Sequence, residues 1–574
     1  MKKWKILNKS QISALPAGRP NHKTQINKVI KILLENRGIK TGKEIKGFLK
    51  PKLSDVTVPS VGIDKKQLKK TVERINKAIL RKEQVVIFGD YDVDGVCGTA
   101  ILWETLNDLG VKVLPYIPHR IDEGYGLSIR GIENLKSQIP NPKLIITVDN
   151  GIVANDAVGF ANENGIDIII TDHHVPSQKL PQSYSIVHTT KICGTGVAWL
   201  LSQEILNFKS EILNKFQTTN YKSQTNGHLG LIALATIADL VPLKGANRTL
   251  VKFGIEELRK TKRIGLLAII KEAGIDKEII NTFEIGHIIA PRLNAMGRLE
   301  YAMDSLRLLC TKDATRAENL AHKLGSTNRR RQEMTIESFE HAKSRIQNSE
   351  FRIQNLIFLA DESYQQGVVG LIAGRLVEEF YRPAIVVSKG EKLSRASARS
   401  VSGFNIIEFI RSASDFLVDA GGHPMAAGFT VETAKLSLVQ ERLEKLAEEI
   451  LNTDMLTQNI RIDCEVGFSL IDSSLYDEIQ NLAPFGMGNA QPTFVSRKII
   501  IEDIRLVGID GKHLKLRLSQ LNSPIQFDAI GFGMGEMSQK IRIGDRIDLI
   551  YQIEQNEWNG NSKLQLKIKD FKAV

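Results

Sequence analysis

The stretch Val85-Val86-Ile87-Phe88-Gly89-Asp90-Tyr91-Asp92-Val93-Asp94-Gly95 decides the fold class of this chain. Its uninterrupted apolar start predicts a buried strand, and the polar turn after it leads into a helical pattern over Gly95–Leu109. Short runs rich in valine and isoleucine recur at Val111–Ile117, Leu144–Val148 and Ile168–Thr171. Continuous apolar strands that alternate with helices indicate an α/β fold with a parallel sheet covered on both faces. The residues just after each strand are therefore the candidates for function, because such sheets bind ligands beyond the carboxyl ends of their strands.

The length of 574 residues predicts about four domains. A charged stretch with only Gly325 as an interruption, Lys312–Lys343, predicts a long connecting helix or a pair of helices. A second α/β unit begins at Asn355–Leu359, and the alternation in His513–Leu518 predicts a small β barrel or sandwich near the end. The predicted divisions are an N-terminal helical and basic segment (1–80), a first α/β domain (81–309), a helical connector (310–350), a second, smaller α/β domain (351–455) and a C-terminal β barrel (456–574).

Local signals add detail to this plan. Asp510-Gly511 and Asn559-Gly560 are turn signals within the predicted barrel. The polar segment Asn207–Gly230 is typical of a surface insertion.

Composition narrows the class of protein. Charged residues make up 25% and hydrophobic residues 42%, which excludes a largely disordered, collagen-like or coiled-coil chain. No apolar run approaches the roughly 20 residues of a membrane span, so no membrane partner is expected. The four cysteines are far apart and form no CxxC motif, which favours the cytoplasm. Lys and Arg outnumber Asp and Glu, 77 − 65 = +12, and this excess suggests a polyanionic partner.

Three aspartates at alternate positions follow the first strand: Asp90, Asp92 and Asp94. An EF-hand calcium loop would need glutamate at the twelfth position, where Ile101 stands, and a helix before the loop. A helix cap explains only one of the three carboxylates. The other two carboxylates therefore need an explanation other than helix capping.

Further acidic and imidazole groups follow other apolar runs. Asp149 comes after the third strand, His173 and His174 after the fourth, and Asp239 after a later run. Each alone is weak evidence, but several carboxylates in one crevice repel one another unless cations neutralise them. A mixed Asp and His set suits Mn²⁺ or Mg²⁺, and the absence of cysteine argues against structural zinc.

These segments resemble a known superfamily. Asp90–Gly95, Val148–Gly151, Asp172-His173-His174 and Ala238–Pro242 look like successive motifs of the DHH phosphoesterases. Ser397–Ser400 and Gly421–Gly428 resemble the companion, DHHA1-like domain, while Pro291–Arg298 and Ala483–Asn489 resemble the RecJ family of single-strand-specific 5′→3′ DNA exonucleases. The resemblance covers nearly the whole chain in order. It implies a catalytic DHH domain at 81–309, a DHHA1-like domain that binds phosphate or nucleic acid at 351–455 and an OB-like nucleic-acid-binding domain at 456–574.

The resemblance also implies two divalent ions, Mn²⁺ or Mg²⁺. Asp94, His173 and Asp239 would hold one ion, Asp92 would serve the other, and Asp149 would bridge them. Related phosphatases have a histidine where this chain has Phe88, so either that metal site is looser or Asp90 reaches it. His174 is also counted as catalytic. We expect it to contact phosphate or support the site, because neighbouring side chains in extended backbone face opposite sides.

Positive and polar groups are expected on the substrate phosphates. Arg399 is the best candidate for binding a terminal 5′-phosphate, because its planar guanidinium can donate two parallel hydrogen bonds to a phosphate. An active site in a cleft between the two α/β domains would admit one strand and exclude a duplex. The full set of predicted nucleic-acid contacts is Arg120, Tyr125, Arg292, Asn294, Arg298, Ser397, Arg399, Ser400 and His423.

Three hypotheses follow. The leading one is a metal-dependent 5′→3′ exonuclease on single-stranded DNA that acts in repair and recombination, with a single-strand-binding protein and a helicase as candidate partners. The second is another phosphoesterase of the superfamily, acting on oligoribonucleotides, cyclic dinucleotides or pyrophosphate, but a small substrate needs no barrel domain. The third is a non-enzymatic scaffold, which would be expected to have lost metal ligands.

Overall fold

The computed structural model describes residues 2–8, 11–12, 22–120, 122–212, 228–347, 355–521, 525–558 and 561–574. The turn expected at Asn559-Gly560 and most of the insertion expected over Asn207–Gly230 lie outside these residues. The chain divides into two compact units. One contains Ser54–Val241 and Ala246–Gln458, and the other contains Met1–Leu53, Pro242–Gly245 and Asn459–Val574.

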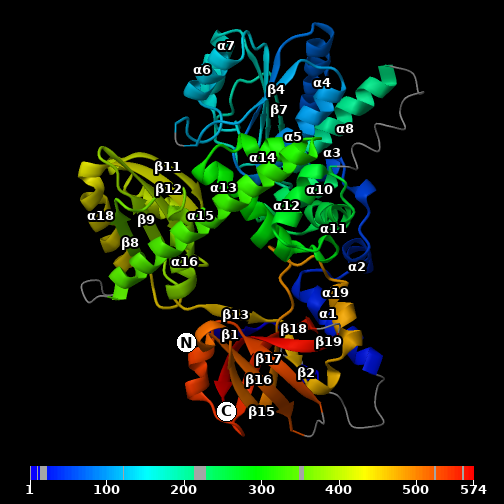
Figure 1. Ribbon diagram of the computed structural model, residues 1–574, viewed down its shortest axis with the longest axis vertical. Helices are drawn as coiled ribbons and strands as arrows, with labels where there is room; N and C mark the ends of the chain where they lie inside the picture. Colours follow the sequence, from blue (N-terminus) through cyan, green and yellow to red (C-terminus); the bar gives the residue numbers. More distant parts are fainter. Residues whose placement is uncertain are drawn as a thin grey trace. The chain divides into compact units, whose positions relative to one another are not determined.

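The first sheet is parallel throughout, as expected, with the strand order β4-β3-β5-β6-β7 (Figure 1). The order reverses between β3 and β5, and this is the place where open α/β sheets bind ligands. Helices α6 and α7 cover one face, while α5 and α8 pack on the other, where Gly98 of α5 lies against Val148. The elements are β3 (Val85–Gly89), β4 (Val113–Tyr116), β5 (Leu144–Val148), β6 (Asp167–Asp172), β7 (Ser185–His188), α3 (Val58–Val61), α4 (Lys65–Leu80), α5 (Val93–Asp108), α6 (Ile129–Gln138), α7 (Asn155–Glu163) and α8 (Gly194–Ile212).

A helical region follows this sheet. It consists of α10 (Leu229–Ala238), α11 (Gly245–Arg259), α12 (Ile264–Glu272), the π-helix η3 (Glu284–Ile289), α13 (Ala290–Leu299), α14 (Met303–Cys310) and α15 (Ala314–Gln347). The charged stretch that predicted a connector is the 34-residue helix α15. Its apolar side packs on α12, α13 and α16, so its charged residues mark the solvent side of one long helix.

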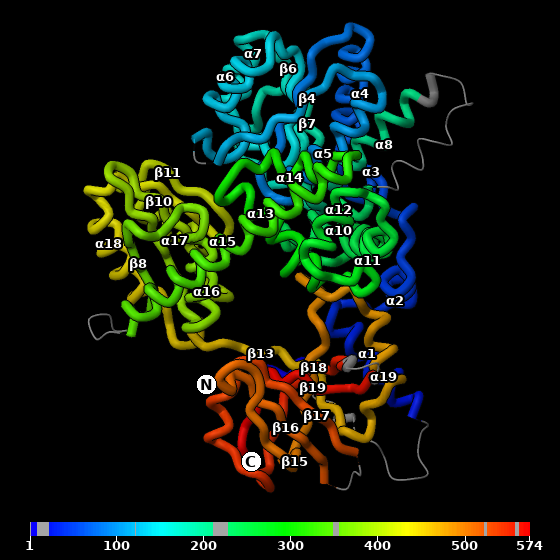
Figure 2. Tube along the Cα trace, viewed as in Figure 1, coloured from blue at the N-terminus to red at the C-terminus, as the bar shows by residue number. Residues whose placement is uncertain are grey.

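The second α/β domain has a five-stranded mixed sheet with the order β11-β12-β10-β9-β8. Three of these strands, β11, β10 and β8, are labelled in Figure 2. Only the β8–β9 pair is parallel. Helices α15 and α16 share a core with one face, and α17 and α18 share a core with the other. The elements are β8 (Ile357–Asp361), β9 (Ala384–Ser388), β10 (Leu393–Arg399), β11 (Leu417–His423), β12 (Ala426–Glu432), α16 (Val369–Phe380), α17 (Ile406–Arg411) and α18 (Leu436–Ile450).

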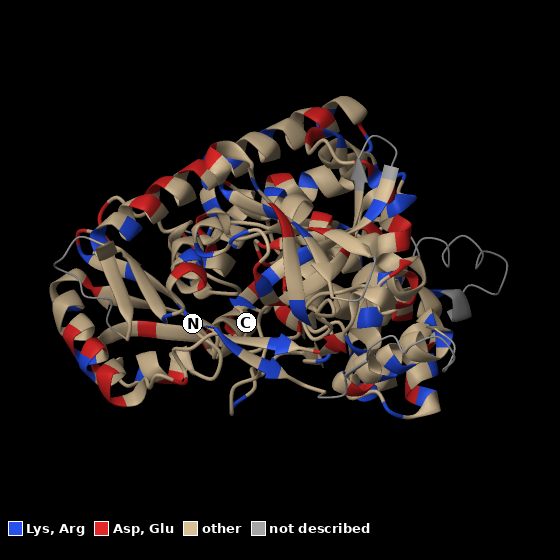
Figure 3. Cartoon of the chain, turned by 90° about the horizontal axis from the view of Figure 1, so that it is seen from below, with Lys and Arg blue, Asp and Glu red and all other residues tan. Residues whose placement is uncertain are grey.

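The C-terminal unit is built on a closed barrel, because β15 pairs with both β16 and β18. Helix α1 and α19 pack against the barrel core, so the first residues of the chain fold with the last ones. Lysines and arginines lie on strands beside the two chain ends (Figure 3). The elements are β1 (Lys3–Ile6), β2 (Gln11–Ile12), α1 (His22–Asn36), α2 (Gly42–Leu49), β13 (Asn459–Ile462), β14 (Cys464–Val466), α19 (Ser473–Gln480), β15 (Phe494–Val507), β16 (His513–Gln520), β17 (Gln526–Gly531), β18 (Arg546–Trp558) and β19 (Asn561–Ala573).

The predicted fold class is confirmed: a parallel-sheet α/β domain, a helical connector, a smaller α/β domain and a C-terminal β barrel. Among the described residues, no helix is both long and apolar enough to cross a membrane.

Candidate metal centre and its arginine neighbours

The loop after β3 brings three carboxylates to the start of α5. Asp92 is the N-cap of this helix, and its Oδ1 accepts hydrogen bonds from the backbone N–H groups of Asp94 and Gly95 at 2.9 and 3.1 Å. A Cβ at position 95 would lie 2.5 Å from the carbonyl oxygen of Asp90, so only glycine allows the loop to fold back this closely. The cap uses one carboxyl oxygen of Asp92 and leaves the other for a ligand.

Asp149 follows β5 and adopts φ +63°, a left-handed conformation that aspartate tolerates better than most residues. Gly194, at the start of α8, lies directly against it, and a Cβ there would lie 2.8 Å from the Asp149 side chain. The backbone N–H groups of Gly194 and Thr195 each donate to an oxygen of Asp94 at 2.7 Å. The start of α8 therefore fixes Asp94 and lets Asp149 approach it.

The two histidines follow the end of β6. The Nε2 atom of His173 lies 3.1 Å from Asp149 Oδ1, 3.5 Å from Asp239 Oδ2 and 3.6 Å from Asp94 Oδ2. The Nδ1 atom of His174 lies 2.8 Å from Asp172 Oδ1 and 3.9 Å from Asp149 Oδ1.

The expectation that the two histidines point to opposite sides is wrong, since their ring centroids are 4.6 Å apart. The alternation of side chains ends with the strand at Asp172. The Oδ1 atom of Asp172 accepts the N–H groups of both His173 and His174, and this turn directs both rings to one side.

Seven side chains meet in three overlapping groups whose ligand atoms lie within 4.8 Å of one another. The groups are Asp94, His173 and Asp239; Asp90, Asp92 and Asp149; and Asp149, His173 and His174. Within the part of the chain that the structure describes, the buried atoms Asp90 Oδ1, Asp149 Oδ1 and His173 Nε2 have no hydrogen-bond partner. Lone pairs that converge in a buried space without donors fit divalent cations. The division into two ions is still a prediction, and this geometry agrees with it.

Burial and mutual repulsion govern the charges of this cluster. Burial, followed by the neighbouring carboxylates, raises the pKa of Asp90, Asp92 and Asp149, and raises that of Asp239 to about 8. Burial opposes the charged form of His174, but its hydrogen bond to Asp172 outweighs this effect and raises its pKa to about 9. Without a cation the cluster therefore retains protons that a divalent ion would displace.

Phe88 does not belong to the cluster. It is fully buried and packs against Tyr116, with ring centroids 5.3 Å apart. Asp90 lies with Asp92 and Asp149 instead. Of the two alternatives that the sequence left open, the geometry favours Asp90 as the additional ligand.

Predicted phosphate-binding side chains surround the cluster. The guanidinium of Arg120 lies 5.1 Å from the centre of the Tyr91 ring. The Tyr125 hydroxyl lies 3.2 Å from His174 Nε2, and the His423 ring stacks on His174 with centroids 6.2 Å apart. His423 belongs to the second α/β domain, so both domains contribute to the site.

Arg298 and Arg399 belong to the same surroundings. Burial, followed by the charges of Arg120, Arg331 and Arg399, lowers the pKa of Arg298 to about 10. Arg399 donates to Ser397 Oγ at 3.3 Å beside the first turn of α16. A Cβ at Gly370 in this turn would lie 2.9 Å from Ser397 Oγ and 3.1 Å from an Arg399 nitrogen. Glycine thus brings the start of α16 against the Ser397 and Arg399 side chains.

Three other predicted contacts make bonds within the protein. Arg292 pairs with Glu272 at 2.8 Å, and Ser400 Oγ donates to the Phe404 carbonyl at 2.6 Å. Asn294 Oδ1 accepts the N–H of Val93 at 3.0 Å, so it positions the loop of the metal cluster. Their contacts with nucleic acid stay predictions.

Comparison with known proteins identifies the family. The model of the DHH family, N-terminal domain, matches residues 84–236, the DHHA1 domain model matches 353–452, and the RecJ OB domain model matches 462–570. The single-stranded-DNA-specific exonuclease RecJ of Bacillus subtilis is 36% identical over 556 residues, which are 95% of this chain and 68% of the relative. The chain belongs to the RecJ family.

Solved structures of the RecJ family share the fold. RecJ of Thermus thermophilus in complex with Mn²⁺ superimposes with a TM-score of 0.78 at 27% identity, covering 99% of this chain and 79% of the other. The Mg²⁺ complex of the same protein gives 0.73 at 25% identity, with 99% and 78% covered.

The sequence did not reveal the residues that hold the functional side chains of this RecJ-family site in place. It did not identify Gly194, Thr195 or Gly370 as residues that bring helix starts against functional side chains. The segment Gly194-Thr195-Gly196 was a signal, because closely spaced glycines at a helix start often allow a close approach.

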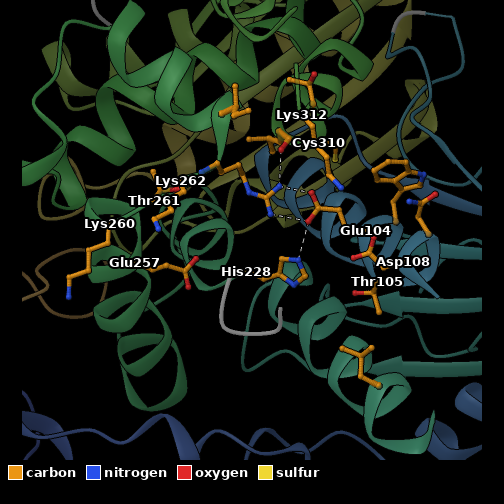
Figure 4. A pocket seen from close by; sticks show the side chains of 17 residues that line it. Glu104, Thr105, Asp108, His228, Glu257, Lys260, Thr261, Lys262, Cys310 and Lys312 are labelled. Carbon is orange, nitrogen blue, oxygen red and sulfur yellow. Dashed lines mark hydrogen bonds and ion pairs between the residues drawn. The ribbon is translucent and has the colours of Figure 1, made fainter. Parts of the chain in front are cut away.

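A separate cavity of about 830 Å³ lies outside the metal cluster (Figure 4). Glu104 at its wall pairs with Arg263 at 2.6 Å and with His228 at 3.0 Å. The Glu104 carboxylate is thus already matched by the guanidinium of Arg263.

Proposed function

We propose that this chain is a metal-dependent 5′→3′ exonuclease that hydrolyses the phosphodiester bonds of single-stranded DNA, in DNA repair and recombination. The observation that carries the proposal is the juxtaposition of the Asp and His cluster with Arg120, Arg298 and Arg399. Membership of the RecJ family supports it, because the relatives are named single-stranded-DNA-specific exonucleases.

Two divalent ions, Mn²⁺ or Mg²⁺, would be held by Asp90, Asp92, Asp94, Asp149, His173 and Asp239. When bound, such a pair lowers the pKa of a water and stabilises charge on the phosphoryl oxygens. The chain's own residues position the substrate. His174, held by Asp172 and Tyr125, places an imidazole beside the cluster, and His423 stacks on its other side.

End recognition would come from the second α/β domain. Arg399, Ser397 and the first turn of α16 form a donor group for a terminal 5′-phosphate, because a helix start and a guanidinium both favour anions. Arg120 is in charge contact with both this group and the cluster, since its charge acts on Arg399 and on Asp90. Arg298 is in charge contact with Arg120 and Arg399. A phosphate bound there would leave the next phosphodiester at the metals, which gives cleavage from the 5′ end.

The barrel would hold the rest of the strand. Lys567 lies 5.5 Å above the ring of Phe532, which is 56% exposed, and His513 flanks the same ring. An exposed aromatic ring beside a lysine suits a base and its phosphate.

A single-strand-binding protein and a helicase are the proposed protein partners, since they would present and produce single strands. The proposed location is the cytoplasm.

The test is digestion of oligonucleotides labelled at the 5′ end in one series and at the 3′ end in another. Single-stranded DNA, duplex DNA and RNA are each incubated with Mn²⁺, Mg²⁺ or EDTA. We expect metal-dependent release of the 5′ label as mononucleotide from single-stranded DNA alone. Release from the 3′ end first, or equal digestion of blunt duplex, would contradict the proposal.

A further inference from the structure

Helix α13 lies directly against the metal loop, which is the turn between β3 and the start of α5. The Oδ1 atom of Asn294 accepts the N–H of Val93 at 3.0 Å. A Cβ at Gly297 would lie 2.4 Å from the carbonyl oxygen of Tyr91, so only glycine allows this approach. Tyr91 and Val93 stand on either side of Asp92 in the sequence. The backbone of α13 therefore supports the metal loop on both sides of a metal-ligand candidate.

The next residue of α13 reaches the second α/β domain. A Cβ at Gly367 would lie 2.3 Å from the carbonyl oxygen of Arg298, and the Arg298 guanidinium donates to the Gly367 carbonyl at 3.3 Å. Gly367 comes just before α16, whose first turn carries Gly370 against Ser397 and Arg399. The contacting residues of α13 share one face, because residues three and four positions apart are neighbours on a helix. One turn of α13 thus connects the metal loop to the donor group for the 5′-phosphate.

Helix α13 is itself held by three other helices. Arg292 in its first turn pairs with Glu272 of α12 at 2.8 Å, and Glu272 also pairs with Arg329 of α15 at 3.0 Å. The hydroxyl of Ser305 in α14 donates to the Leu293 carbonyl at 2.9 Å. Close-packed backbones with such anchors do not slide past one another without losing these contacts. The position of the metal loop relative to α16 is therefore fixed through α13.

The two groups that α13 connects are a short distance apart. Arg399 and His423 each pair with Ala426, one from either side, so their side chains lie on one face of the sheet. Two strand spacings separate them, or roughly 10 Å. The His423 ring in turn stacks on His174 at the metal cluster, with centroids 6.2 Å apart. A strand whose terminal phosphate is held at Arg399 thus reaches the metals over a short span, and this span decides which phosphodiester is cleaved.

We propose that α13 sets the length of the product, because it holds the metal cluster at one fixed distance from the group that binds the 5′-phosphate. The positioning residues are Asn294, Gly297 and Gly367, which we call the α13 joint. A rigid joint gives mononucleotide alone, whereas a loosened joint brings the second phosphodiester to the metals in part of the complexes. This inference rests on the proposed function, because it requires a 5′-phosphate held at Arg399 and cleavage at the metal cluster.

The test determines the size of the labelled fragment that is released from single-stranded DNA with a 5′-phosphate label in Mn²⁺. The labelled fragment is always the first one cut from its strand, and the wild type should release it as mononucleotide. Gly297→Ala places a methyl group against the Tyr91 carbonyl, and Gly367→Ala places one against the Arg298 carbonyl. Each should raise the ratio of dinucleotide to mononucleotide about tenfold, which corresponds to about 1.4 kcal/mol between the two barriers.

Asn294 provides a milder variant with its own rescue. Asn294→Ala removes the acceptor of the Val93 N–H and should also raise the ratio, whereas Asn294→Asp keeps an acceptor oxygen and should release mononucleotide. Gly374→Ala is the matched control, since it is the same substitution within α16. Among the described residues, a Cβ at Gly374 would meet no neighbouring segment within 4 Å. The number of Mn²⁺ ions bound per chain should stay at the wild-type value in all variants, because no ligand candidate is replaced.

Variants of the α13 joint that all still release mononucleotide alone, or that all lose turnover, would overturn the proposal. A lower Mn²⁺ count in all of them would also overturn it, since they would then act on the metal site and not on its distance from Arg399. A wild type that releases no labelled mononucleotide would instead count against the proposed function.

Discussion

Replacing Asp239 by asparagine should stabilise the metal-free protein. Burial, then the charges of Asp94 and Asp92, raises the Asp239 pKa from 3.8 to about 8. The group therefore contributes its full stabilisation below pH 3.8 and loses it as the pH rises to about 8. At pH 7 the loss is 7 − 3.8 = 3.2 pH units, or about 4 kcal/mol at 1.36 kcal/mol per unit. The side chain is 29% exposed, so screening by solvent reduces this to roughly 2 kcal/mol.

The assay is thermal unfolding in EDTA at pH 5 and pH 7. Asparagine cannot ionise, so Asp239→Asn should raise the midpoint of this domain by about 4–8 °C at pH 7 and by less than half as much at pH 5. Added Mn²⁺ should reverse the order, because the wild type then gains binding energy that the variant lacks. Asp156→Asn, at an exposed aspartate of α7, is the control and should change neither midpoint.

A variant that is less stable than the wild type in EDTA at both pH values would refute this reasoning. So would a gain that does not grow with pH. Either result would mean that the cluster is not a group of repelling carboxylates that needs cations.

Two further predictions concern the substrate. Arg399→Ala should slow cleavage of 5′-phosphorylated strands by about 10–150-fold, because a hydrogen bond to a charged group contributes about 1.5–3 kcal/mol. Cleavage of 5′-hydroxyl strands should be affected much less. Cleavage rates on the two substrates measure this difference, and an equal loss on both would mean that the 5′-phosphate binds elsewhere. Phe532→Ala should weaken binding of long single strands by about 1–3 kcal/mol per stacked base while short oligonucleotides are still cleaved. Titration with strands of increasing length checks the second prediction, and an unchanged affinity for long strands would remove Phe532 from the binding path.

Much of the metal centre could be predicted because it depends on a simple rule. Parallel strands present their carboxyl ends at one edge, so residues after different strands, such as Asp92, Asp149 and His173, meet there although they are far apart in sequence. The direction of His174 could not be predicted from strand alternation, because the chain leaves the strand at Asp172 and the Asp172 carboxylate reorients the turn.

Roles that depend on packing between distant helices escaped the sequence. Asn294 resembles a substrate contact by its motif, but only the docking of α13 on α5 reveals that it holds the Val93 N–H. Arg331 belongs to the charged stretch that is typical of a solvated helix face, yet its Nε is buried. The packing of α1 against the barrel is likewise a contact between the two ends of the chain, for which no local pattern exists.

The central claim is that the cluster binds two divalent ions and that these drive hydrolysis. The most direct measurement counts Mn²⁺ ions per chain by titration calorimetry in the wild type and in Asp149→Asn, with nuclease turnover measured on the same samples. We expect two ions and rapid cleavage of single-stranded DNA in the wild type. The variant should lose ion binding and turnover together while its affinity for DNA is largely kept, because Asp149 belongs to two of the three ligand groups. An Asp149→Asn protein that still turns over at a near-normal rate with both ions bound would contradict the account.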